Sequence, residues 1–249
     1  LFTYTGVSSA VSPNEFTGVT RATSSTGAAL HLGNVVVSSS WTEIDTGRTS
    51  AAKYRFERFN YNGTDKIIFV DEVNAPVVFD SSFNAVDVAA SSVSGSKFIA
   101  SFKDHMFYAG KSTTPEEVVF SVPFDEDNFG SGAGSIRVDD TITGLKVFRD
   151  ALFIFCENRI FKLTGVSEST FVMTPVTRSI GCLNGDTIQE FAGDLVFLGP
   201  DGLRTVAATA KIGDTELGTI SKNVQSIFDA NIRDSAKFES VVIADKTQY

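Results

Sequence analysis

The sequence predicts an all-β protein, a β-propeller with blades of about 41–46 residues and one short helix near residues 222–230. Two observations predict this class. The chain is rich in Val, Ile, Ser, Thr and Gly and contains 22 Phe but only six Pro, a composition typical of β-sheet proteins. A motif of an aromatic residue, a turn with Asp or Gly, and an apolar run also recurs at spacings of 41, 46 and 43 residues. A period in the low forties with several strands per unit is typical of propeller blades.

Four copies of this motif follow one another along the chain. They are Tyr61–Val70, Phe102–Ala109, Phe148–Phe155 and Phe191–Leu198. A second strand follows each copy after a turn, and these second strands are Pro76–Phe79, Val118–Ser121, Arg159–Leu163 and Gly202–Val206. Inner strands of a blade are buried on both faces, so they are expected to be continuous apolar runs such as Ala151–Cys156. Outer strands alternate, as Ser135–Asp139 does. We therefore expect Phe148–Gly165 to be the first hairpin of one blade.

The whole chain, residues 1–249, is expected to form one propeller or a segment of one, with clear blade repeats from about residue 54. Residues 1–53 are expected to form a partial or less regular blade, in which Asn34–Val37 and Trp41–Ile44 resemble strands. The alternative is a β-sandwich whose strands resemble one another by chance. The number of blades stays open.

One helix is expected after the last repeat. Ser221 is a good N-cap, and Val224, Ile227, Phe228 and Ile232 follow at spacings of three and four. A helix this short is expected to dock on a blade, because it is not stable alone.

The net charge of −9 and the pI near 4.7 argue against a protein that grips nucleic acid, because phosphate binding needs clustered Lys and Arg. They do not exclude a structural protein that lines a channel through which DNA passes without binding. The sequence has no apolar run of about 18 residues and no secretory signal. The chain lacks an initiator Met and stops at Tyr249 directly after the strand-like Val241–Ile243, so we expect a segment, a processed product or a partly ordered chain.

The sequence predicts no catalytic, cofactor-binding or metal-ligating residue. His31 and His105 are its only histidines, and His105 lies inside the repeat, where a structural role is expected. Cys156 is expected to be a small buried hydrophobe and Cys182 to follow a loop; a disulfide between them stays open.

Three polar stretches have weak functional interpretations. Phe124–Asn128 is acidic like a calcium loop but lacks the alternating spacing, so a solvated loop is expected. Asp139-Asp140 is expected to form a turn. Gly130–Gly134 is not followed by a helix pattern, so a flexible loop is expected instead of a phosphate site.

Several segments, in order, resemble β-propeller virion proteins of short-tailed phages, the tail nozzle or tail tubular protein B type and the related phage stabilisation and tail accessory proteins. The segments are Lys97–Gly110, Val118–Ser121, Pro123–Phe129, Ile142–Leu145, Phe148–Gly165, Phe197–Arg204, Ile220–Phe228, Ser240–Ile243 and Gln248-Tyr249. The resemblance covers roughly residues 54–249 and is a pattern of strands with no catalytic signature. Nozzle proteins are usually much longer than this chain.

The resemblance implies a non-enzymatic structural protein of the virion tail. It implies a homo-oligomeric ring, a hexamer in that family, that contacts the portal adaptor and tail fibre proteins. The genome would pass through its channel during ejection without specific binding. The alternative function is a carbohydrate-binding or glycoside-cleaving propeller, which requires a single mouth with converging aromatic and carboxylate side chains.

Overall fold

The computed structural model describes residues 52–207 without a gap, together with residues 2–3, 6–8, 15–17, 20–21, 45, 47–49, 220–221, 223, 225–232 and 238–243. The chain divides into two compact units, Leu1–Thr46 and Gly47–Tyr249. His31 and the predicted strands Asn34–Val37 and Trp41–Ile44 lie outside the described residues.

In the first unit the described backbone forms two antiparallel pairs. Strand β1 (Phe2–Thr3) pairs with β4 (Thr20–Arg21), and β2 (Gly6–Ser8) pairs with β3 (Glu15–Thr17). A partial blade over residues 1–53 remains a prediction.

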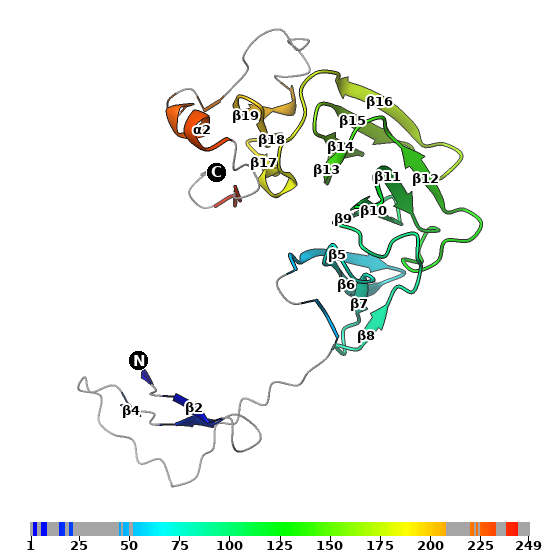
Figure 1. The fold of residues 1–249 in the computed structure, drawn as a ribbon. Helices are drawn as coiled ribbons and strands as arrows, with labels where there is room; N and C mark the ends of the chain where they lie inside the picture. Colours follow the sequence, from blue (N-terminus) through cyan, green and yellow to red (C-terminus); the bar gives the residue numbers. More distant parts are fainter. Residues whose placement is uncertain are drawn as a thin grey trace. The chain divides into compact units, whose positions relative to one another are not determined.

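The second unit contains four antiparallel sheets, each a meander in which neighbouring strands are consecutive in the sequence (Figure 1). Sheet I contains β5 (Arg55–Tyr61), β6 (Thr64–Val70), β7 (Val77–Phe79) and β8 (Ala85–Asp87). Sheet II contains β9 (Phe98–Phe102), β10 (His105–Lys111), β11 (Thr114–Phe120) and β12 (Gly134–Arg137). Sheet III contains β13 (Ile142–Phe148), β14 (Ala151–Cys156), β15 (Ile160–Thr164) and β16 (Val172–Thr177). Sheet IV contains β17 (Gln189–Phe191), β18 (Asp194–Gly199) and β19 (Gly202–Thr205). The all-β prediction is therefore confirmed.

The predicted repeat corresponds to one structural feature in all four sheets. Each leading aromatic residue ends the first strand, and a two-residue loop joins it to the second strand. The loops are Asn62-Gly63, Lys103-Asp104, Arg149-Asp150 and Ala192-Gly193. In three of them both residues have positive φ, as type I′ turns require. The repeat therefore marks the turn between the first and second strands.

This position corrects the predicted hairpin. Ala151–Cys156 and Ile160–Thr164 are the second and third strands of sheet III, and the first strand, Ile142–Phe148, precedes them. The first strand β13 was not recognised in the sequence because Gly144 and Lys146 interrupt its apolar pattern.

Three cores join the sheets face to face in chain order. Sheets I and II share one core, II and III the next, and III and IV the third. Strand β14 is buried along its whole length because its side chains alternate between two cores. Leu152 and Ile154 enter the core with sheet II, whereas Phe153 and Phe155 enter the core with sheet IV. The predicted burial of Ala151–Cys156 is confirmed.

Helix α2 (Gln225–Asn231) lies beside β19 and begins three residues after the predicted start (Figure 1). Ser221 does not cap it as predicted: its hydroxyl donates to Gln225 Oε1 (2.9 Å) and accepts from the Leu203 N–H. Gln225 donates to the Asp201 carbonyl oxygen (2.6 Å). Ile227 is exposed, so polar contacts rather than this apolar side chain attach the helix to sheet IV. Val224 lies outside the described residues.

Candidate functional site

A cavity of about 490 Å³ lies where the first strands of the sheets approach one another. Its walls come from β5, β9, β13 and β17, from the 3-10 helix η1 (Gly185–Thr187), and from residues 239–240 near the end of the chain. Because each of these strands opens its own sheet, the meander topology brings four distant parts of the sequence to one place (Figure 1).

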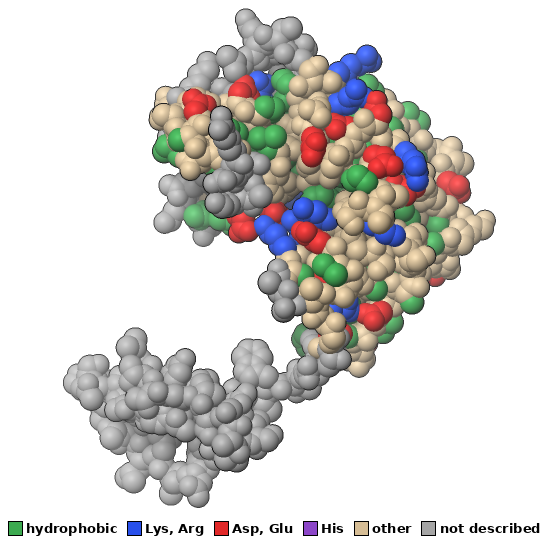
Figure 2. All heavy atoms as spheres, viewed as in Figure 1, with side chains coloured by type: hydrophobic (Ala, Val, Ile, Leu, Met, Phe, Trp, Pro, Cys, Tyr) green, Lys and Arg blue, Asp and Glu red, His purple; other side chains and the backbone are tan. Residues whose placement is uncertain are grey.

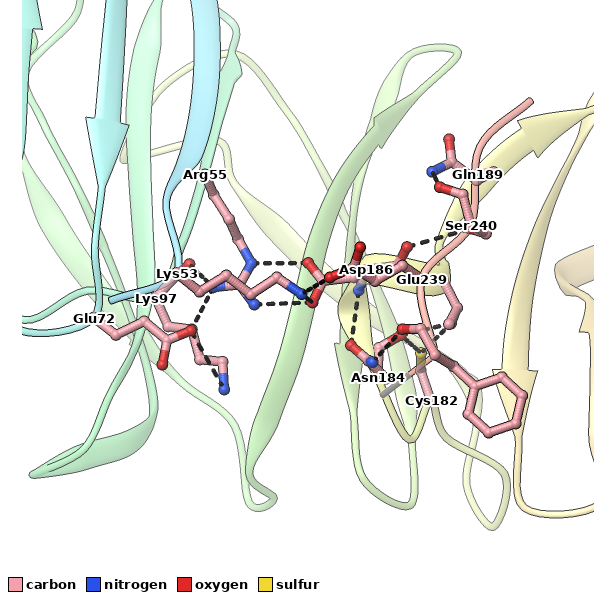
Figure 3. Close-up of polar contacts among 12 residues, drawn as sticks. Lys53, Arg55, Glu72, Lys97, Cys182, Asn184, Asp186, Gln189, Glu239 and Ser240 are labelled. Carbon is pink, nitrogen blue, oxygen red and sulfur yellow. Dashed lines mark hydrogen bonds and ion pairs between the residues drawn. The ribbon is translucent and has the colours of Figure 1, made fainter. Parts of the chain in front are cut away.

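Arg55 crosses the cavity to Asp186, which lies 131 residues further along the chain (Figure 3). Its Nε and Nη2 donate to the two carboxylate oxygens of Asp186, each at 3.0 Å. Nη1 donates to Glu72 at 2.6 Å, and the guanidinium lies 5.0 Å from the ring centroid of Phe98. The aromatic face and the two carboxylates fix the planar guanidinium in one orientation.

Lys53 extends this network toward the end of the chain. Its Nζ lies 2.7 Å from both Asp186 and Glu239 (Figure 3). Asn184 donates to the Phe238 carbonyl oxygen, and Gln189 donates to the Ser240 carbonyl oxygen. These contacts attach residues 238–240 to the wall of the cavity.

Asp186 is held ionised by its cations. Burial by itself disfavours the charged carboxylate, but hydrogen bonds and charge from Arg55 and Lys53 outweigh it and lower the pKa of Asp186. The Asp186 carboxylate therefore acts as a hydrogen-bond acceptor, and donors already occupy its oxygen atoms.

Glu57 has the opposite shift. Burial raises its pKa, although the Ser101 N–H donates to Oε1 at 3.1 Å and the positive charge of Lys146 acts in the other direction. Glu57 follows Arg55 by two residues on β5, so both point to the same face of the strand. The cavity thus contains two carboxyl groups whose pKa values are shifted in opposite directions.

Two glycines let β13 approach η1 at the cavity. A Cβ on Gly185 would lie 2.1 Å from the Thr143 carbonyl oxygen, and a Cβ on Gly144 would lie 2.4 Å from the Ile188 side chain. A side chain at Gly185 would displace backbone, and one at Gly144 would displace the Ile188 side chain. The Gly144–Lys146 stretch and the Asp186 turn are therefore close because neither glycine has a side chain.

The described residues that the sequence offered as candidates are not among those that line this cavity. His105 is buried, its Nδ1 bonds to the Ser121 carbonyl oxygen at 2.6 Å, and the ring packs against Phe107, Phe120 and Phe171, which fits the predicted structural role. Its Nε2 has no partner among the described atoms.

Both cysteines are free and buried, so the open question of a disulfide is answered: none forms. Burial raises the pKa of Cys156 and of Cys182 to about 12. Neither thiol has the character of a nucleophile.

The acidic loop differs from the solvated loop that was predicted. Glu126 is buried, and its carboxylate bonds to Lys66 Nζ at 2.5 Å, which ties the loop to sheet I. The Asp127 carboxyl shares a hydrogen bond with the Asp125 carboxylate, which favours protonated Asp127 and raises its pKa. Within the described residues, no group of three or more His, Cys, Asp or Glu is arranged to hold a metal ion.

The two other polar stretches form turns and loops. Asp139 pairs with Arg159, and Asp140 accepts from the Asn158 backbone N–H at 2.7 Å, so Asp139-Asp140 forms the predicted turn. Gly134 begins β12, and a Cβ there would lie 2.8 Å from the Phe120 ring. The glycine-rich segment thus has a packing role at its end.

No motif in the sequence indicated the charged residues of the cavity. One signal was available: in Arg55–Tyr61 the odd positions Phe59 and Tyr61 are core residues, which places Arg55 and Glu57 on the same inward face. Asp186 and Lys146 carried no comparable signal.

Comparison of the sequence with known protein families and with curated proteins finds no match in either. No helix of the described residues is long and apolar enough to cross a membrane. Acidic and basic side chains are interspersed on the face shown in Figure 2, with no large patch of one sign.

Proposed function

We propose that this chain is a β-propeller segment of a phage tail, a structural part of the nozzle or tail tube through which the genome is ejected. The observation that carries the proposal is the consecutive face-to-face packing of four meander sheets whose first strands share one cavity. Blades of a propeller pack in this way, with their first strands around a central axis. The cavity is then part of the axial channel.

The cavity network supports a structural role. Arg55, Lys53, Asp186 and Glu239 bond to one another across the cavity, so their charges hold sheet I, η1 and residues 238–240 together. A nucleophile with an adjacent base is the usual sign of covalent catalysis, and both cysteines of this chain are buried and protonated.

The electrostatics suit a channel wall. The net charge of the whole chain is −9, and a channel enclosed by a ring of such chains repels DNA phosphates, so the genome slides past without adhering. In this proposal the chain forms a homo-oligomeric ring in the virion tail and contacts the portal adaptor and tail fibre proteins.

Electron microscopy of particles from the phage that encodes this chain tests the proposal. A gold-labelled antibody against residues 52–207 is expected to bind at the tail, and mass spectrometry of purified tails is expected to find the chain. A chain that is absent from purified particles and purifies as a monomer contradicts the proposal.

A glycoside-cleaving propeller is the second candidate, because Glu57 and Asp186 line one cavity and their pKa values are shifted in opposite directions. Glu57 would act as the acid and Asp186 as the ionised partner. Hydrolysis of chromogenic glycosides that disappears in Glu57→Gln would support this function, and no hydrolysis by the wild type would refute it.

A further inference from the structure

Two polar groups of the cavity take no part in the network that joins Arg55, Lys53, Asp186 and Glu239. Lys146 lies on its wall and acts on Glu57 by charge, but among the described residues it makes no hydrogen bond or ion pair. Glu57 accepts the Ser101 N–H through Oε1, and no described donor bonds to its Oε2. A half-buried ammonium and a half-buried carboxyl oxygen are therefore available to a third molecule.

The charges of the cavity balance. Three cationic side chains and three carboxyl groups line it: Lys53, Arg55, Lys146, Glu57, Asp186 and Glu239. A site for phosphate or another anion would need an excess of positive charge, which this set does not have. The balance favours a neutral ligand whose groups both donate and accept hydrogen bonds.

One aromatic ring lies in the wall. Phe98 lines the cavity beneath the Arg55 guanidinium, whereas the Phe56 side chain points to the other face of β5 from Glu57 and contacts Phe69. Ligand cavities of about 300–1,000 Å³ commonly combine apolar walls with a few such polar groups. At about 490 Å³ this cavity is large enough for one or two small rings.

We propose that the cavity binds a neutral saccharide, with hydroxyl groups that donate to Glu57 and accept from Lys146. Hydroxyl groups suit both partners because each one donates and accepts. The proposal rests on the cavity alone and holds whether or not the chain belongs to a tail.

Saturation-transfer difference NMR on the full chain tests the site, with glucose, galactose, mannose, N-acetylglucosamine and their disaccharides as probes. At least one neutral sugar is expected to receive magnetisation and to bind with a measurable Kd. Lys146→Met and the isosteric Glu57→Gln are each expected to weaken it about tenfold or more, because Met removes a charged hydrogen-bond donor and Gln removes the negative charge that strengthens the bond to Glu57.

Lys162→Met is the matched control. Lys162 is also a half-buried lysine on a strand of sheet III, but it does not line the cavity, so its replacement is expected to leave the Kd unchanged. The far-UV circular dichroism of each variant is recorded, and Glu57→Gln serves alone if Lys146→Met does not fold.

Three results would overturn the proposal. They are no transfer to any neutral sugar, binding that Glu57→Gln leaves unchanged, and tighter binding of glucuronate or inorganic phosphate than of the neutral sugars. The tail assignment is judged separately, because Glu57→Gln particles are still expected to contain the chain whatever the sugar result.

Discussion

Replacing Asp186 by Asn is expected to weaken the contact between sheet I and the turn before sheet IV. In the wild type Arg55 donates two hydrogen bonds of 3.0 Å to this carboxylate, and Lys53 adds a third contact at 2.7 Å. The amide side chain of Asp186→Asn would keep one acceptor oxygen but would lose the negative charge. Arg55 would keep its bond to Glu72.

The magnitude follows from the burial of the pair. The Arg55 and Asp186 side chains are 16% and 18% exposed, so water screens them only in part. Fully exposed ion pairs contribute about 0.2–1 kcal/mol, and hydrogen bonds to charged groups about 1.5–3 kcal/mol. We expect Asp186→Asn to lower the free energy of unfolding by about 2 kcal/mol at pH 7.

A double-mutant cycle measures the interaction. Urea unfolding of the wild type, Arg55→Met, Asp186→Asn and the double variant gives the coupling energy, expected to be about 1.5–2 kcal/mol. The m value is expected to stay constant, since the surface exposed on unfolding does not change. The pair Arg159–Asp139 has the same chemistry but is 38% and 69% exposed, so water screens it and its cycle is expected to give a clearly smaller coupling energy.

The pH dependence gives a second check. The pKa of Asp186 is lowered in the folded state, so its contribution is present above the ordinary carboxyl pKa of about 3.9 and is lost as the pH falls through the folded value. Asp186→Asn and the wild type are therefore expected to converge in stability at acid pH. A coupling energy below about 0.5 kcal/mol, or equal coupling in both cycles, would refute this account of the cavity.

Four further outcomes are expected. The pKa of Glu57 is raised, so its charged form opposes folding. Glu57→Gln is therefore expected to stabilise the chain at pH 7 and to lose this advantage below about pH 4. Thermal unfolding at both pH values measures the difference in stability. Gly63→Ala is expected to lower the free energy of unfolding in urea by about 1 kcal/mol, because Gly63 has φ +79°; no atom lies near a new Cβ, so the cost is backbone strain alone. Ala192→Gly, at φ +51°, is expected to stabilise the chain. Leu152→Ala is expected to cost about 2–5 kcal/mol, since Leu152 is fully buried between sheets II and III; an unchanged urea midpoint would contradict the assigned packing. Cys156 and Cys182 are both expected to resist iodoacetamide in the native chain at pH 8 and to react in urea, as mass spectrometry would show.

The sequence was sufficient for the repeated part of the fold. An aromatic residue, a two-residue turn and an apolar run recur four times, and the structure has a strand end, a tight turn and a second strand at each copy, mostly buried in β10, β14 and β18 and buried only over its last three residues in β6. These features depend on local backbone preference and on burial of both faces, which neighbouring residues reveal. The first strands β5 and β13 were less visible because they face the cavity on one side and carry Arg55, Glu57 and Lys146 there, whereas β9 is apolar along the cavity.

The helix shows where local signals fail. Ser221 has the right type and spacing for an N-cap, but its hydroxyl bonds to Gln225 and to the Leu203 N–H of β19. A hydroxyl has several partners within reach, and the neighbouring strand decides among them.

The sequence by itself determined the all-β class, the four repeated turns and the buried strands, because these follow from periodicity and turn chemistry over a few residues. Only the tertiary structure decided the cavity. Arg55 and Asp186 are 131 residues apart, and they meet because stacked sheets place their first strands side by side and because Gly144 and Gly185 allow close approach. Pairing across such a separation depends on the packing of whole sheets, which no local pattern of residues encodes.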